Sequence, residues 1–216
     1  MSIQTEPLGA PPSTPPRADG VPGLERNEGT GLELDWVRDA RVNRSAVERR
    51  AATLTTRRSV KKDWQAAWLL KAVTLIDLTT LAGDDTAGRV RRLCAKALNP
   101  VRQDLLDDLG VSDLGITVGA VCVYHEMVPT AVHALRGSGV PVAAVSTGFP
   151  AGLSPFATRV EEITRSVAAG ATEIDIVISR RHVLNQDWQA LYDEVRAFRQ
   201  ACGEAHAHFA GETAWP

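Results

Sequence analysis

The sequence has little cysteine and no long apolar run. Its cysteines (Cys94, Cys122 and Cys202) are three in number, lie far apart and form no C-x-x-C pair. This argues against a disulfide framework and a structural zinc site, and for a reducing compartment. No apolar run approaches the roughly 20 residues that span a bilayer, and residues 1–16 lack the basic and apolar regions of a secretory signal. We therefore expect a cytoplasmic protein with no membrane partner.

The sequence also lacks an excess of charge of either sign. Its 216 residues carry 24 Lys and Arg against 26 Asp and Glu, a net charge of −2. Such a chain has no general attraction for nucleic acid, so we expect no nucleic-acid partner. Lysine is scarce among the basic residues, because only four are present and none follows position 96: Lys61, Lys62, Lys71 and Lys96.

The composition changes along the chain and suggests its domains. Residues 1–31 hold six of the 12 prolines and few apolar groups, so we expect a disordered tail there. Residues 32–72 have helical patterning with Trp36, Trp64 and Trp68 on apolar faces, and we expect an N-terminal helical cap. From residue 73 onward, short β-rich runs alternate with amphipathic helices.

This alternation predicts an α/β fold with a parallel sheet. The expected strands, with room for one more within residues 205–210, are Val73–Thr79, Ile116–Tyr124, Val142–Ser146 and Thr172–Ile178. The helix after the third strand has Ser154 as its expected N-cap and Pro155 at its first position. No phosphate-binding glycine motif follows any strand. The main candidate is the TIM (β/α)₈ barrel, but such a barrel takes about 250 residues, so the chain accounts for only the first four to five βα units.

Two aspartates stand out on the expected strands. Alternation along a strand puts Ile174 and Ile176 on one face and Asp175 on the other, and Asp77 has the same placement on the first strand. In a barrel both carboxylates would enter the interior near the active end, where an Asp can shuttle protons. The alternative is a carboxylate that pairs with an arginine or caps a turn.

Other candidate features are less specific. Cys122 shares a strand face with Tyr124 and could line the same interior, although cysteine is more often a small buried apolar residue. The Gly148–Gly152 loop would let a ligand approach the backbone closely, or it is only a tight turn. Cys202, His206 and His208 have no fourth ligand, so we expect no metal site.

Four blocks in order resemble the deoxyribose-phosphate aldolase family: Ile76–Leu81, Ala120–Tyr124, Gly148–Gly152 and Ala171–Ile178. The segment Val60–Lys71 looks like the longer form of that family, and the resemblance runs from about Leu32 to His206. It implies a class I aldolase, which cleaves 2-deoxy-D-ribose 5-phosphate reversibly to D-glyceraldehyde 3-phosphate and acetaldehyde through a lysine Schiff base. No metal or other cofactor is implied, and the partners are the small phosphorylated sugar and acetaldehyde.

The resemblance also assigns residues. Asp175 matches the strand-4 aspartate that relays protons, with a second lysine that depresses the pKa of the first. Asp77, Thr79 and Cys122 match residues of the substrate pocket. Both family lysines lie on later strands, which residues 73–206 do not contain, and residues 207–216 diverge from the family. His125 replaces the family's usual proline.

We therefore expect that the chain is an aldolase homologue that stops early and is inactive alone. A second hypothesis is a non-catalytic half-barrel that associates with itself, as a homo-oligomer, or with a separate C-terminal half. A third is an unrelated α/β protein that binds a small molecule.

Overall fold

The computed structural model describes residues 30–57 and 59–209. The chain divides into two units, residues 1–30 and 31–216, and every helix and strand described lies in the second. Most of the expected tail at 1–31 and most of the expected divergent end at 207–216 lie outside the described residues, so both remain predictions.

The second unit begins with helices and continues as alternating strands and helices. Its strands are β1 (Asp77–Thr79), β2 (Ala120–Tyr124), β3 (Val142–Ser146), β4 (Glu173–Ile176) and β5 (His206–Phe209). Its α-helices are α1 (Leu34–Asp39), α2 (Arg44–Ala52), α3 (Asp63–Val73), α4 (Ala87–Leu98), α5 (Gln103–Asp108), α6 (Val128–Ala134), α7 (Phe156–Ala168), α8 (Arg180–Leu184) and α9 (Trp188–Cys202). Short 3₁₀ turns are η1 (Leu54–Thr56), η2 (Ser112–Leu114) and η3 (His125–Met127).

The strands form one parallel sheet in sequential order, β1-β2-β3-β4-β5. A doubly wound sheet would reverse its order after the first strands, whereas sequential order is the pattern of a (β/α)₈ barrel. The expected fold class is confirmed: the chain forms the first βα units of such a barrel, preceded by a helical extension. The additional strand expected within residues 205–210 is β5.

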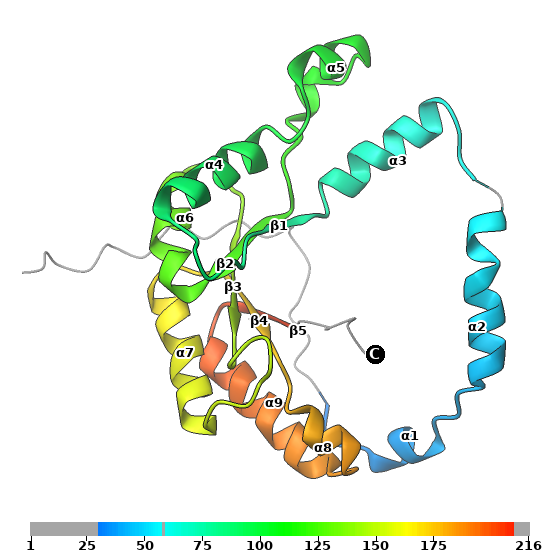
Figure 1. Ribbon diagram of the computed structural model, residues 1–216, viewed down its shortest axis with the longest axis vertical. Helices are drawn as coiled ribbons and strands as arrows, with labels where there is room; N and C mark the ends of the chain where they lie inside the picture. The colour runs from blue at the N-terminus through cyan, green and yellow to red at the C-terminus, as the bar shows by residue number, and fades with distance from the viewer. Residues whose placement is uncertain (1–29, 58, 210–216) are drawn as a thin grey trace, which may run out of the picture. The chain divides into compact units, whose positions relative to one another are not determined.

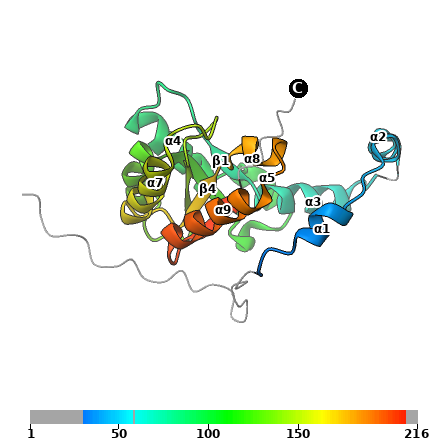
Figure 2. The ribbon, with the colours of Figure 1, turned by 90° about the horizontal axis from the view of Figure 1, so that it is seen from below.

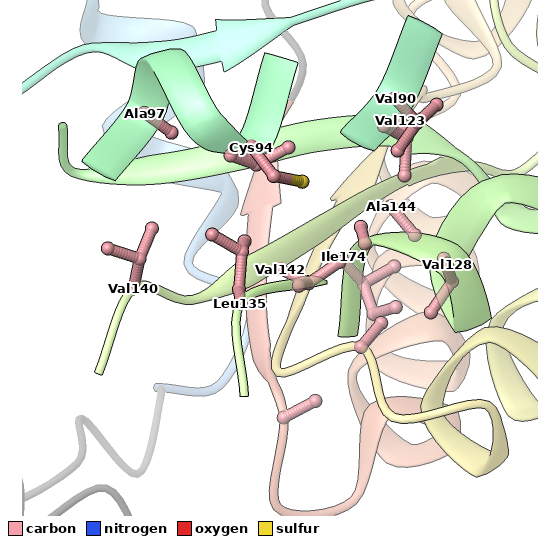
Figure 3. Packing of buried hydrophobic residues seen from close by; sticks show 14 of the residues in the cluster. Val90, Cys94, Ala97, Val123, Val128, Leu135, Val140, Val142, Ala144 and Ile174 are labelled. Carbon is pink, nitrogen blue, oxygen red and sulfur yellow. The ribbon is translucent and has the colours of Figure 1, made fainter. Parts of the chain in front are cut away.

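One face of the sheet packs on helices. In Figure 1 the helices α4, α6, α7 and α9 line this face, and Figure 2 shows α7 and α9 beside each other from a second direction. Figure 3 shows side chains of α4 and α6 gathered against those of β2, β3 and β4. The strand residues in this core are alternate ones: Val121, Val123, Val142, Ala144, Ile174 and Ile176. Alternation in the sequence therefore gives the sheet a helix-covered face and an opposite face.

Two expected strands begin later in the structure. Val73 is the last residue of α3, and the N–H groups of Leu75 and Ile76 bond back to the carbonyls of Ala72 and Val73. This turn uses the donors that a strand would need, so β1 begins only at Asp77. β2 begins at Ala120 instead of Ile116, after Gly119 and Ala120 donate to the carbonyl of Ile76.

Two further boundaries differ from the expected ones. The prediction of Ser154 as N-cap was wrong: α7 begins at Phe156, and Pro155 precedes it without a side-chain cap. β4 ends at Ile176 instead of Ile178, since the N–H of Val177 donates to Oγ1 of Thr147 and not to a neighbouring strand.

The helices before the sheet expose their apolar side chains. None of the residues of α1, α2 or α3 is buried, and Trp36, Trp64 and Trp68 are 65%, 74% and 60% exposed. The expected cap at residues 32–72 is thus helical in large part, and its role as a cap remains a prediction.

Replacing a residue of the helix-covered face tests this packing. Ile174 is fully buried, so Ile174→Ala removes apolar contacts and leaves a cavity, with a cost of about 2–5 kcal/mol in the free energy of unfolding. The exposed Leu184, at 64%, is the matched control, and Leu184→Ala is expected to cost under about 0.5 kcal/mol. Urea unfolding measures both; equal costs would contradict the packing.

Candidate active site

The opposite face of the sheet carries a second, smaller cluster. Cys122, Ala143 and Val145 form its buried centre, and Leu81, Tyr124 and Phe149 pack against it. In the strand register Thr79 pairs with Cys122, Cys122 with Ala143, and Val145 with Asp175. Because paired residues of parallel strands point to the same face, the aspartate and the cysteine are brought to one surface.

Cys122 and Asp175 make contact across an intervening strand. The Sγ of Cys122 lies 3.2 Å from Oδ2 of Asp175, although β3 separates β2 from β4. In a (β/α)₈ barrel, side chains from alternate strands share one interior layer. On β3, Ala143 pairs with Cys122 and Val145 pairs with Asp175, so the contact joins two neighbouring rows of the sheet.

Burial and the contact with Asp175 together keep the Cys122 thiol protonated. Burial raises the pKa of the Cys122 thiol far above its usual range, and the nearby carboxylates of Asp175 and then Asp77 raise it further. A hydrogen bond with Thr79 acts in the opposite direction and does not offset these causes. The thiol is therefore protonated at neutral pH and donates its S–H to the Asp175 carboxylate.

The structure brings all of the sequence-predicted residues of this site together. Asp77 and Thr79 are both on β1, and Oγ1 of Thr79 donates to the backbone carbonyl of Asp77 at 2.8 Å. Both residues lie close enough to Cys122 to shift the pKa of its thiol. Asp77 and Thr79 are exposed, Asp175 is half-buried and Cys122 is 2% exposed. The cysteine is thus both a buried apolar residue and a polar partner.

Two side chains that sequence reasoning missed fix the end of β4. Thr147 takes a φ of +61°, a rare conformation for a β-branched residue. Its Oγ1 donates to the carbonyl of Val177 at 2.9 Å and accepts the N–H of Val177 at 2.6 Å. Farther along, the N–H and Oγ of Ser179 donate to Glu194 at 2.7 and 2.6 Å. These bonds hold the backbone that follows Asp175.

Glu194 is itself held by a buried ion pair. Arg159 Nη2 lies 2.8 Å from Glu194 Oε2, and both side chains are buried. Burial alone would raise the pKa of Glu194, but the bonds from Ser179 and Arg159 outweigh it and lower the pKa. Glu194 is therefore ionised at neutral pH. No local motif reveals this pair, because its members are 35 residues apart on α7 and α9.

The Gly148–Gly152 loop forms a tight turn at the end of β3. The N–H of Gly152 donates to the carbonyl of Gly148 at 2.9 Å, and Gly148 has a φ of +77°. A Cβ on Gly148 would lie 2.8 Å from Oγ of Ser154, so glycine is required there. The N–H of Gly148 donates to Glu162, a third residue missed from the sequence, at 2.9 Å.

None of the four lysines lies on a strand of the described sheet. Lys61 and Lys62 precede α3, Lys71 is on α3 and Lys96 is on α4. A hollow of about 230 Å³ brings Lys96 close to β1, and its lining residues are Thr79, Thr80, Arg89, Arg92, Leu93 and Lys96. Within residues 30–57 and 59–209, no group of three metal-ligating side chains occurs, and no helix is long and apolar enough to cross a membrane.

Known proteins match this chain in sequence and in fold. Residues 71–209 match the family model of the DeoC/LacD family aldolases. The chain is 58% identical over 182 residues to the deoxyribose-phosphate aldolase of Homo sapiens. This match covers 83% of this chain and 57% of that protein. It is 60% identical over 180 residues to the Mus musculus protein of the same name, covering 82% of this chain and 57% of that protein. The chain therefore spans a little over half the length of these curated relatives.

Solved structures agree with this match. A structure from Coccidioides immitis, whose proposed identity is deoxyribose-phosphate aldolase, aligns with a TM-score of 0.53 at 27% identity, over 64% of this chain and 48% of that one. The structure of QR15, an aldolase, aligns with a TM-score of 0.50 at 22% identity, over 62% of this chain and 52% of that one. The second likeness concerns the fold alone.

Removing either of the two carboxylates near Cys122 is expected to lower the pKa of its thiol, by different amounts. Asp175→Asn removes the larger of the two carboxylate effects, so the pKa of Cys122 is expected to fall, while burial keeps it above 9.0, the ordinary thiol value. Asp77→Asn is expected to lower it less. The pH dependence of iodoacetamide alkylation at Cys122, followed by peptide mass spectrometry, measures both. A larger effect of Asp77→Asn would contradict the geometry.

Proposed function

The chain belongs to the DeoC/LacD aldolase family, and on that premise we propose that its sheet supplies one part of the active site of a deoxyribose-phosphate aldolase. The reaction is the reversible cleavage of 2-deoxy-D-ribose 5-phosphate to D-glyceraldehyde 3-phosphate and acetaldehyde through a Schiff base. The observation that carries the proposal is the Cys122–Asp175 contact at 3.2 Å on the face opposite the helices. The substrates are thus a small phosphorylated sugar and acetaldehyde.

Asp175 is the proposed proton relay of this site. Its carboxylate lies half-buried at the carboxyl end of a barrel strand, where barrel enzymes carry out their chemistry. The neutral Cys122 thiol donates a hydrogen bond to this carboxylate at 3.2 Å. Asp77 and Thr79 are proposed to line the substrate pocket beside it.

The amine of the Schiff base has to come from elsewhere. A Schiff base requires a lysine amine at the reacting carbon, and the four lysines of residues 1–216 lie before β1 or on the outer helix α4. We therefore propose that these 216 residues contribute the acid–base part of the site and do not turn over substrate alone.

The proposed function is tested in a chimera with the human relative. Residues 71–209 replace the matching segment of the human relative, which then supplies the lysines from its remaining sequence. We expect deoxyribose-phosphate cleavage by the chimera and a loss of about 10²- to 10⁴-fold in kcat for Asp175→Asn. Glu161→Ala, on the exposed side of α7, is the control and leaves kcat unchanged. Full activity of a folded Asp175→Asn chimera would refute the proposed relay.

A separate experiment tests the chain by itself. With deoxyribose phosphate and borohydride, the 216-residue chain is expected to yield no trapped lysine adduct that supports turnover. Peptide mass spectrometry would locate any adduct among the four lysines. Turnover together with an adduct at Lys96, the lysine that shares a hollow with Thr79, would show that the chain carries its own amine.

A second candidate role is association through the edges of the sheet. β1 and β5 are the end strands of the described sheet, and an edge strand offers unpaired backbone groups to another chain.

The exposed tryptophans of residues 32–72 support a packing role for that segment as a cap or contact surface. Sedimentation velocity tests the role: it predicts a dimer or larger homo-oligomer, and a well-folded monomer at micromolar concentration would contradict it.

The cysteines support a cytoplasmic location for this protein. All three are free and buried, which is the usual state in a reducing compartment.

A further inference from the structure

We propose that Glu162 is a positioning residue that holds the aromatic wall, Tyr124 and Phe149, against the Cys122 side of the site. That this aromatic wall borders a substrate pocket rests on the proposed function. The contacts of Glu162 with the wall do not depend on it. Glu162 lies on α7, outside the residues matched to the family's site, and no sequence motif pointed to it.

Both oxygens of the Glu162 carboxylate are engaged by segments that follow neighbouring strands. Its Oε2 accepts the N–H of Gly148, just after β3, at 2.9 Å. Its Oε1 lies 3.4 Å from Nδ1 of His125, just after β2. One side chain therefore connects the carboxyl ends of β2 and β3 to α7, and the Glu162 side chain is only 18% exposed.

Each partner of Glu162 adjoins one of the two aromatic residues. Tyr124 directly precedes His125, and Phe149 directly follows Gly148. The two rings meet edge to face, with centroids 6.1 Å apart and planes at 64°, a favoured aromatic arrangement. The Glu162 carboxylate thus holds the backbone beside Phe149 and contacts the imidazole of the residue that follows Tyr124.

The aromatic wall in turn shields the cysteine. Tyr124 and Phe149 pack with Leu81 against the cluster of Cys122, Ala143 and Val145, and Cys122 is 2% exposed. Helices cover the other face of the sheet, so on this face loop and strand side chains provide the shielding. If Glu162 releases Gly148, the loop that carries Phe149 loses its anchor on α7, and Cys122 becomes accessible.

The neighbouring Glu161 provides a matched control. Its Oε1 accepts from Nε of Arg165 at 2.8 Å one helical turn away, and both side chains are exposed. Glu161→Ala removes a carboxylate from the same helix without touching either aromatic segment. Glu162→Gln keeps an oxygen acceptor for Gly148 but removes the charge that faces His125.

The experiment measures labelling of each cysteine by N-ethylmaleimide at pH 8 in the full chain, by peptide mass spectrometry. Glu162→Ala is expected to speed labelling of Cys122 about tenfold, the effect of losing one charge-assisted hydrogen bond. Glu162→Gln is expected to show a smaller increase and Glu161→Ala none. Hydrogen exchange in the peptide of residues 147–152 should accelerate in the same order.

Cys94 and Cys202 separate positioning from general destabilisation. Both are buried among the helices, at 1% and 0% exposure, so their labelling is expected to stay slow in every variant. Unchanged Cys122 labelling in Glu162→Ala, or an equal rise at all three cysteines, would overturn the proposal. Neither the labelling nor the hydrogen-exchange measurement depends on turnover, so both can be made even if the chain is not an aldolase. A negative result for Glu162 would not affect the proposed role of Asp175.

Discussion

The burial of alternate strand side chains against the helices is the constraint on which the rest of this structure depends. Ile174 and Ile176 are almost fully buried in the helix-covered core, and each such side chain contributes about 1.5–3 kcal/mol when removed from water. Their burial commits Asp175, between them, to the opposite face. A slip of β4 by one residue would bury the carboxylate and expose both isoleucines, so the core also fixes the site.

The site is built from what this constraint leaves on the opposite face. Cys122 reaches Asp175 across β3, and the buried thiol stays protonated beside the carboxylate. The backbone after β4 is held by Thr147 and Glu194, and the loop after β3 by Glu162. Asp175 thus sits in a scaffold whose polar anchors come from α7, α9 and the loop after β3.

Sequence patterns could predict the sheet and the faces of its residues, because strand alternation and helix periodicity are local. They predicted β3 to the residue and placed Asp77, Thr79, Cys122 and Asp175 on one surface. Strand ends were harder, since Thr147 ends β4 from 30 residues away. Glu162 and Glu194 were missed for the same reason: their partners come from other elements, and no spacing along the chain encodes such contacts.

The coupling free energy between Cys122 and Asp175 shows whether the sheet holds these two side chains in contact. A double-mutant cycle of Cys122→Ala and Asp175→Ala, measured by urea unfolding at pH 7, isolates their interaction. If the core holds the two side chains in contact, the cycle gives a coupling free energy of at least about 0.5 kcal/mol. Additivity of the two changes would mean that the sheet does not bring these residues together, and the proposed acid–base site would be wrong.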